Sequence, residues 1–262
     1  MKSKLVTPND FPGHPHPASR LFRSIELKVV YDETKGVDFK GPSMDLGCGD
    51  GYLSSILFDD RFTYGIDNGE ANDVDVAIEH KRYEHVLIES AEKMSLKDGS
   101  LNFVFCNSVI EHIPDNEAVL SEVGRTLRKG GIFIFTSPSD KFKEYLYLSN
   151  VLSSIGLGFL GNMYKERRNN MLNHYHTYGH EEWSKRLGRH GMKVKKHKYY
   201  IDKKCCMLWD KIALATRIRG LFDKQAEAHM WDTYKDQIMA QYKRDRVTDD
   251  RGASLFIWAE KE

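Results

Sequence analysis

Short apolar runs of strand length alternate with amphipathic segments along the first half of the chain. Residues 43–46, 62–67 and 103–107 are such runs, and turns and stretches with helical spacing of apolar positions lie between them. Strands that alternate with helices form parallel sheets, which are buried on both faces. The pattern over residues 43–137 therefore predicts an α/β fold.

Other segments lie outside this alternation. Residues 1–16 are polar and proline-rich and predict an arm or the edge of a lid. Residues 18–32 predict a helix whose apolar face is formed by Leu21, Ile25, Val29 and Val30. One stretch covers residues 140–179 and precedes a predicted helix near residue 181. Another covers residues 202–251 and precedes a predicted final strand over 253–259. We expect these two stretches to be additions to the sheet.

Composition narrows the class of protein. The 39 Lys and Arg residues nearly balance the 38 Asp and Glu residues, which argues against nucleic acid as a partner. The four cysteines show no C-x-x-C zinc spacing and favour a reducing cytoplasm. The N-terminal residues lack the apolar core of a signal peptide, and no apolar run is long enough to span a bilayer.

The run Met44-Asp-Leu-Gly-Cys-Gly-Asp-Gly-Tyr52 is the strongest motif. Three glycines at every second position, between a strand and a helix, allow positive φ and let a ligand approach bare backbone. The free N–H groups of a helix start favour an electronegative ligand. Asp67 ends the next predicted strand, about 20 residues later, where an acid in α/β nucleotide folds accepts hydrogen bonds from a ribose diol.

This D-x-G-x-G-x-G run resembles motif I of class I S-adenosylmethionine-dependent methyltransferases. Residues 89–102 are similar to the type-11, ubiquinone-biosynthesis-like branch, with Ser90 in place of the usual acid and Asn102 in place of the last Asp. Residues 103–115 and 127–138 are similar to the fourth strand with its loop and to the fifth strand. The resemblance covers roughly residues 40–138 and, more weakly, 181–200.

The resemblance implies a Rossmann-like, seven-stranded, mostly parallel sheet with helices on both faces. Helical additions would follow strand 5 and precede the last strand. We expect a single domain over residues 1–262, with an N-terminal arm and helix over residues 1–35. Its core would combine about 40–138 with 181–200 and 252–262, and the additions at about 140–179 and 202–250 would form the substrate pocket or a lid.

The resemblance also implies S-adenosyl-L-methionine as cofactor. Its methionine end would lie at the glycine turn, its ribose at Asp67 and its adenine beside Ser90 and Ala91, with the Asn107 backbone near the reactive end. The full expected cofactor-binding set is Asp45, Gly47, Cys48, Gly49, Asp67, Asn68, Ser90, Ala91 and Asn107.

Histidines provide the candidates for proton transfer, because histidine titrates near neutrality. His112 follows the fourth strand, at the family position near the methyl group, and His174 and His176 belong to a polar cluster over residues 173–180. The alternative is that all three histidines lie in loops and only pack against neighbours or form hydrogen bonds with nearby backbone groups. The His-x-His pair suggests a metal, but no acid has a fitting spacing, so we expect no metal site.

We expect methyl transfer to a small-molecule or glycan acceptor, most simply as an O-methylation. Two alternatives remain at this stage: N- or C-methylation of another metabolite, and a non-catalytic cofactor-binding subunit that regulates or scaffolds a partner. The basic run over residues 165–170 could face an acidic group of the substrate or be a solvated helix end.

The segment 207–222 has basic residues around one apolar helical face, formed by Leu208, Ile212, Ala215, Ile218 and Phe222. Such a helix can rest on an anionic membrane surface. The alternative is that this face is buried against the sheet or in a homodimer interface.

Overall fold

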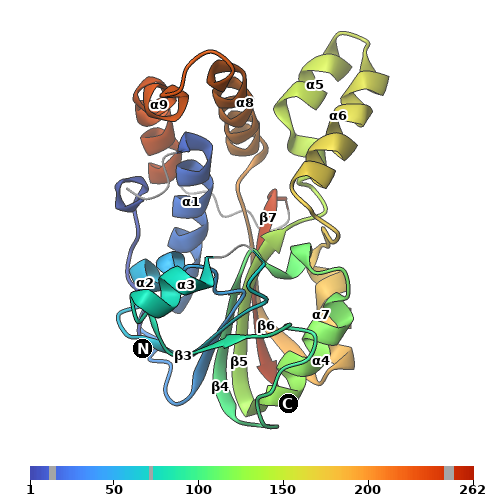
Figure 1. Cartoon of the computed structure of the whole chain (residues 1–262). Helices are drawn as coiled ribbons and strands as arrows, with labels where there is room; N and C mark the ends of the chain where they lie inside the picture. Colours follow the sequence, from blue (N-terminus) through green and yellow to red (C-terminus); the bar gives the residue numbers. More distant parts are fainter. Residues whose placement is uncertain (12–15, 71–72, 245–250) are drawn as a thin grey trace.

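The computed structural model describes residues 1–11, 16–70, 73–244 and 251–262. Seven strands form one sheet in the order β3-β2-β1-β4-β5-β7-β6 (Figure 1). The first five strands in the chain run parallel, and β7 runs antiparallel to both β5 and β6. The strands are β1 Ser43–Leu46, β2 Phe62–Asp67, β3 Tyr83–Ile88, β4 Leu101–Asn107, β5 Leu127–Pro138, β6 Met192–Tyr200 and β7 Ser254–Lys261. The predicted mostly parallel, seven-stranded fold is confirmed.

Helices cover both faces of the sheet (Figure 1). The α-helices are α1 Pro17–Thr34, α2 Tyr52–Leu57, α3 Val74–Glu79, α4 Asn116–Thr126, α5 Tyr147–Ser154, α6 Gly158–Met171, α7 His180–Arg189, α8 Lys203–Gly220 and α9 Ala226–Lys243. Short 3-10 helices are η1 Pro8–Asp10, η2 Ile110–His112 and η3 Lys143–Tyr145. In the view of Figure 1, α1, α2 and α3 lie on one side of the sheet and α4 and α7 on the other.

The alternation of side chains along β4 explains why the sheet has a core on each face. Phe103 and Phe105 belong to one hydrophobic cluster, whereas Val104 and Cys106 belong to the other. Successive strand residues point to opposite faces, so an uninterrupted apolar run fills both cores.

The two additions are helical, as predicted. Helices α5 and α6 follow β5, and helices α8 and α9 precede β7; α1 packs against both α8 and α9. These helices lie beyond the carboxyl ends of the parallel strands (Figure 1). Ligands of open α/β sheets bind at that edge, so the additions enclose the edge where a site is expected. Part of the N-terminal arm, at residues 12–15, and residues 245–250 of the second addition lie outside the described residues.

The membrane interpretation of residues 207–222 is wrong for the middle of the apolar face. Ile212 is fully buried, and Leu208 packs against the same core. Only the end of the face is open, with Ile218 52% and Phe222 88% exposed. Among the described residues, none of the helices combines the length and apolarity needed to cross a bilayer.

Candidate active site

The glycine turn between β1 and α2 is tied to the end of β2. The N–H of Gly47 donates to the carbonyl oxygen of Ile66 at 2.7 Å. The Asp67 carboxylate accepts from the N–H of Gly49 and from that of Gly69, both at 3.0 Å. Gly47 has a φ of 73°, and a Cβ there would lie 2.4 Å from Val109. Only glycine fits at position 47, because both the backbone conformation and the neighbouring side chain exclude a Cβ.

A cleft of about 890 Å³ opens beside this turn, at the carboxyl ends of β1, β2 and β4. Five of the expected cofactor-binding residues line it: Gly47, Asp67, Asn68, Ser90 and Ala91. The cleft is also lined by three residues from the addition after β5, which is distant in sequence from the glycine turn: Leu172, Asn173 and Tyr175. The structure therefore brings the glycine turn, the β2 acid and the residues after β3 to one cavity.

Asp45 lies behind the glycine turn and is not among the residues that line the cleft. Its side chain is buried, and its Oδ2 accepts hydrogen bonds from the hydroxyls of Ser54 and Tyr83. Burial raises the pKa of Asp45 to about 6. These contacts join β1 to α2 and β3, so the side chain of Asp45 supports the turn from inside the protein.

Three further members of the expected cofactor-binding set also lie outside the cleft lining: Cys48, Gly49 and Asn107. Burial raises the pKa of the Cys48 thiol. The side chain of Asn107 donates to a Glu26 oxygen at 3.0 Å. The amide group of Asn107 is thus turned toward α1.

A second, smaller cavity of about 180 Å³ adjoins the cleft at the end of β4. His112 and Leu172 line both spaces, so they mark the boundary between them. We call this smaller space the inner cavity. It is lined by Ser19, Phe22, Arg23, Ser108, Glu111, His112, Pro138, Phe142, Leu172, His174 and Trp209.

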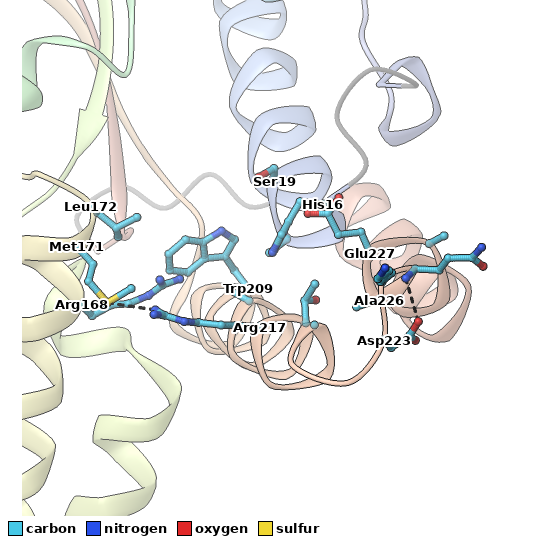
Figure 2. Close-up of a pocket in the computed structure, with 17 residues that line it drawn as sticks. His16, Ser19, Arg168, Met171, Leu172, Trp209, Arg217, Asp223, Ala226 and Glu227 are labelled. Carbon is cyan, nitrogen blue, oxygen red and sulfur yellow. Dashed lines mark hydrogen bonds between the residues drawn. The ribbon is translucent and has the colours of Figure 1, made fainter. Parts of the chain in front are cut away.

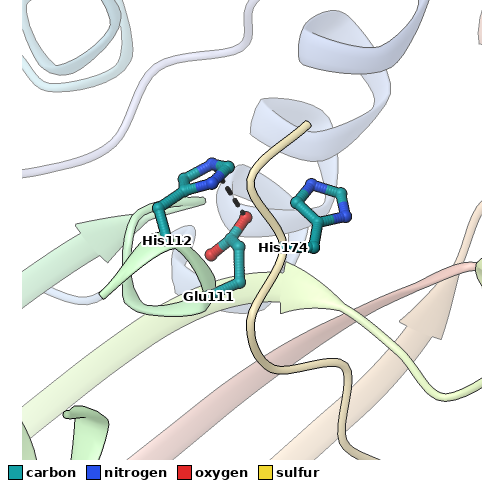
Figure 3. A group of neighbouring side chains, drawn as sticks. All are labelled: Glu111, His112 and His174. Atoms are coloured by element: carbon teal, nitrogen blue, oxygen red, sulfur yellow. Dashed lines mark ion pairs between the residues drawn. The ribbon is translucent and has the colours of Figure 1, made fainter. Parts of the chain in front are cut away.

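Glu111, His112 and His174 meet at the inner cavity, with the two imidazoles on either side of the carboxyl group (Figure 3). His112 Nε2 lies 3.8 Å from Glu111 Oε1, and the two imidazole centroids are 5.3 Å apart. His112 Nδ1 lies 3.1 Å from the carbonyl oxygen of Asn173. Since a carbonyl only accepts, Nδ1 carries the proton in neutral His112, and Nε2 keeps its lone pair.

Burial, which is only partial for His112 because its side chain is 39% exposed, leaves all three groups neutral near pH 7. It lowers the pKa of His112, and it lowers that of His174 to about 3, with a further contribution from His112. It raises the pKa of the Glu111 carboxyl to about 8. Charged forms lose their hydration in such a site, which shifts acids and bases in opposite directions.

His176 lies apart from this group. Its Nε2 is 2.9 Å from the carbonyl oxygen of Pro114, and its Nδ1 is 2.9 Å from the Tyr178 hydroxyl. Both ring nitrogens therefore have partners within the protein. The expected pair of His174 and His176 is divided, and His112 takes the place of His176 beside His174.

The same three residues could in principle hold a metal ion, because ligand atoms of Glu111, His112 and His174 lie within 4.8 Å of one another. Spacing along the chain did not reveal this set, because His174 is 62 residues from His112. The charges of Arg23 and of its partner Glu26 act on Glu111 in opposite directions, and the carboxyl and both imidazoles are neutral near pH 7. We therefore interpret the cluster as a proton-handling group.

A buried ion pair beneath the inner cavity was also missed by sequence reasoning. Arg23 Nη1 donates to Glu26 Oε2 at 2.6 Å, and Glu26 is fully buried. Ser108 and Tyr200 donate to its other oxygen at 2.5 and 3.0 Å. Although burial raises the pKa of Glu26, the Arg23 charge and these hydrogen bonds lower it overall. The signal was an acid and a base three residues apart, with Glu26 directly after Ile25 of the apolar face of the predicted helix.

The sheet order, the glycine turn after β1 and the acid at the end of β2 together define the class I S-adenosylmethionine-dependent methyltransferase fold. A family model described as a methyltransferase domain matches residues 40–200, and the chain belongs to that family.

Curated relatives share only part of their length with this chain. A ubiquinone biosynthesis O-methyltransferase of Coxiella burnetii is 26% identical over 133 residues, which cover 48% of this chain and 55% of the relative. A probable S-adenosylmethionine-dependent methyltransferase of Mycolicibacterium smegmatis is 35% identical over 99 residues, 37% of each chain. The chain thus matches about half, or less, of the length of these relatives.

Solved structures show the same fold over nearly the whole chain. A methyltransferase of Thermotoga maritima, described as a possible histamine N-methyltransferase, has a TM-score of 0.56 at 17% identity, covering 94% of this chain and 91% of that one. A geranyl diphosphate methyltransferase in complex with S-adenosylmethionine has a TM-score of 0.56 at 14% identity, with coverages of 96% and 92%. At such low identity these two structures establish the fold alone.

Proposed function

We propose that this protein transfers a methyl group from S-adenosylmethionine to a hydroxyl of a small-molecule or glycan acceptor. The observation that carries this proposal is the position of His112. Its Nε2 keeps a free lone pair at the boundary between the cleft and the inner cavity. A neutral base at that boundary suits an acceptor whose nucleophile must lose a proton.

The residues of the cleft fit the cofactor. Each Asp67 oxygen accepts one backbone N–H and retains lone-pair capacity for a ribose hydroxyl in the cleft. Gly47 lines the cleft with bare backbone, Asn68 would lie near the ribose, and Ser90 and Ala91 would border the adenine. When bound, S-adenosylmethionine supplies a methyl group already activated on a sulfonium.

The chain's own residues would position the acceptor and take its proton. The inner cavity would hold the reacting end of the acceptor in line with the methyl group and away from water. His112 Nε2 would accept the proton that the acceptor hydroxyl loses when its oxygen is methylated. Protonated Glu111 and neutral His174 would add hydrogen-bonding groups without adding charge to the site.

The relatives support oxygen as the methylated atom, because several are named ubiquinone biosynthesis O-methyltransferases. An amine acceptor, and a protein that binds cofactor without turning it over, are the alternatives. Measuring S-adenosylhomocysteine formation with matched hydroxyl and amine compounds separates these possibilities. Turnover with the hydroxyl compound supports O-methylation, turnover with the amine supports an amine acceptor, and no turnover with either supports a non-catalytic protein.

The decisive variants are His112→Ala and, as a matched control, His176→Ala. If His112 is the base, its loss should lower the turnover rate by about 10²–10⁴ while the affinity for S-adenosylhomocysteine is kept. His176 is bonded away from the cavity, so its variant should keep near wild-type turnover. Equal activity of wild type and His112→Ala on the true acceptor would contradict the proposed role.

Removal of metal ions provides a further check. Because the cluster is interpreted as proton-handling, turnover should survive dialysis against EDTA. Loss of activity that added Mg²⁺ or Zn²⁺ restores would instead assign Glu111, His112 and His174 to a metal.

A further inference from the structure

We propose that the cleft between α6, α8 and the start of α9 binds an anionic group of the methyl acceptor. The acceptor would then be a hydroxyl compound that carries a phosphate or carboxylate some distance from the reacting hydroxyl. This inference rests on the proposed function, since it names the class of acceptor for the same site. We call this space the outer cleft.

The outer cleft adjoins the inner cavity. Its volume is about 970 Å³, compared with about 180 Å³ for the inner cavity. Ser19, Leu172 and Trp209 line both spaces. An acceptor whose reacting end fills the small inner cavity could therefore continue past Leu172 and Trp209 into a space large enough for the rest of the molecule.

Two arginines converge at the end of the outer cleft nearest to Trp209 (Figure 2). Arg168 belongs to the basic run over residues 165–170, and its side chain is 15% exposed. Its guanidinium lies over the Trp209 ring at 4.8 Å and its Nε is 3.2 Å from Asp210 Oδ1. These contacts hold the guanidinium in place, so the cost of ordering it for a ligand is already met.

Arg217 carries a positive charge that is not paired with an acid in the described part of the chain. Its Nη1 lies 3.4 Å from Met171 Sδ, and among the described residues no carboxylate forms an ion pair with it. A thioether is only a weak acceptor, so a carboxylate or phosphate would replace it readily. Arg168 is paired with Asp210 and Arg217 with no described carboxylate, so the two neighbouring guanidinium groups leave one positive charge for a ligand.

Acidic residues of the outer cleft lie at its other end. Asp223 and Glu227 are on the side away from Arg168 (Figure 2). Asp223 is already paired with Arg219 at 2.8 Å and with His229 at 2.7 Å. Among the described residues, neither Asp223 nor Glu227 forms an ion pair with Arg168 or Arg217.

The chemistry at the arginine end selects an anion on a partly apolar body. Guanidinium groups bind carboxylate and phosphate through parallel N–H donors. Met171, Leu172 and Trp209 provide apolar and aromatic surface directly beside these donors. A neutral sugar or a free inorganic anion would use only one half of this surface.

Calorimetric titration of the full chain, saturated with S-adenosylhomocysteine, tests the site. Phenyl phosphate and phenylacetate serve as anionic probes, and benzyl alcohol is the uncharged probe of similar size. Arg217→Gln should weaken phenyl phosphate binding by about tenfold or more, the loss expected for one charge-assisted hydrogen bond. Lys211→Gln removes the same charge from an exposed position of the same helix outside the outer cleft, and should leave the affinity unchanged.

The outcomes separate this inference from the proposed function. Unchanged affinity in Arg217→Gln, equal binding of benzyl alcohol, or no binding of either anion would overturn the anion site. If wild type fails to bind S-adenosylhomocysteine in the same experiment, the proposed function fails first. Arg217 is exposed and outside both cores, so its variant should fold and bind cofactor as wild type does.

A second arm distinguishes the source of the anion. Co-sedimentation with phosphatidic acid vesicles, lost in Arg217→Gln and absent with phosphatidylcholine vesicles, would indicate a lipid headgroup. Binding of phenyl phosphate without vesicle binding would indicate a soluble acceptor. If Arg217→Gln still binds vesicles, the lipid headgroup binds somewhere other than the outer cleft. That result would count against the outer cleft as the anion site.

Discussion

Asp45 and Asp67 have the same side chain and opposite surroundings. Asp45 is buried behind the glycine turn, where desolvation raises its pKa to about 6. Asp67 lines the cleft and holds the N–H groups of Gly49 and Gly69. The first is suited to joining elements inside the protein, and the second to binding a ligand at its surface.

Asp67→Ala should therefore weaken binding of S-adenosylhomocysteine. A hydrogen bond to a charged group contributes about 1.5–3 kcal/mol, so the affinity should fall by roughly tenfold or more. Isothermal titration calorimetry measures this. Asp75→Ala removes an exposed acid of α3 outside the cleft and should leave the affinity unchanged. Equal affinities for wild type and Asp67→Ala would show that Asp67 does not bind the ribose.

Glu111 should make the protein less stable as pH rises. In the folded protein, burial raises the pKa of the Glu111 carboxyl from 4.5 to about 8. Between these two pH values the folded protein keeps a proton that the unfolded chain releases. The contribution of Glu111 to the free energy of unfolding therefore falls, by a few kcal/mol, between pH 4.5 and 8.

Glu111→Gln removes this titration, so its unfolding free energy should fall less than that of wild type across that range. Urea denaturation at several pH values measures the difference. Parallel pH profiles for the two proteins would mean that Glu111 ionises normally in the fold.

At the scale of elements, α1 is joined to the site through Glu26 and Arg23. Glu26 reaches from α1 to Asn107 and Ser108 at the end of β4 and to Tyr200 at the end of β6. Arg23 of the same helix lines the inner cavity. The position of α1 thus determines how the inner cavity is closed.

Glu26→Ala should destabilise the protein by about 3–5 kcal/mol, because removing one partner of a buried pair leaves the other groups unsatisfied. Lys28→Ala breaks an ion pair with Asp32 on the solvent side of the same helix, where both side chains are 32% exposed. That change should cost less than about 1 kcal/mol. Chemical denaturation compares the two variants, and similar losses would show that the Glu26 network does not anchor α1.

At the scale of the whole molecule, three spaces follow one another from the carboxyl ends of the strands to the helices of the two additions. The cofactor cleft and the inner cavity share His112 and Leu172, and the inner cavity and the outer cleft share Ser19, Leu172 and Trp209. Of the residues that the structure describes, Leu172 alone lines all three. Substrate and cofactor would thus approach the β4 end from opposite directions and meet at His112.

Cofactor binding should stabilise the whole fold, because the cleft joins the sheet to the segment after α6. S-adenosylhomocysteine at 100 times its Kd should add about 2.7 kcal/mol, a rise in Tm of roughly 5–10 °C for a protein of this size. Differential scanning calorimetry with increasing ligand measures the shift. Adenosine monophosphate serves as a control that lacks the methionine end, and a shift of equal size with it would contradict the assignment of the glycine turn.

The sequence by itself determined the elements and the turn that holds the cofactor cleft. Apolar periodicity predicted the parallel core, and the glycine spacing predicted the turn between β1 and α2, with Asp67 at the end of β2. These features depend on contacts a few residues apart or on regular alternation. Such information is present in any short window of the chain, which is why the fold class was predicted correctly.

Only the tertiary structure decided which polar side chains meet. His174 lies beside His112 while His176 bonds to Pro114, and Glu111 and Arg23 join the site although nothing in their local pattern required it. Arg217 comes close to Arg168 from a helix that is far along the chain. Burial sets the pKa values of such groups, and burial depends on packing between distant segments. Sequence spacing therefore located the glycine turn and Asp67 that line the cleft, whereas packing alone formed the inner cavity and the outer cleft.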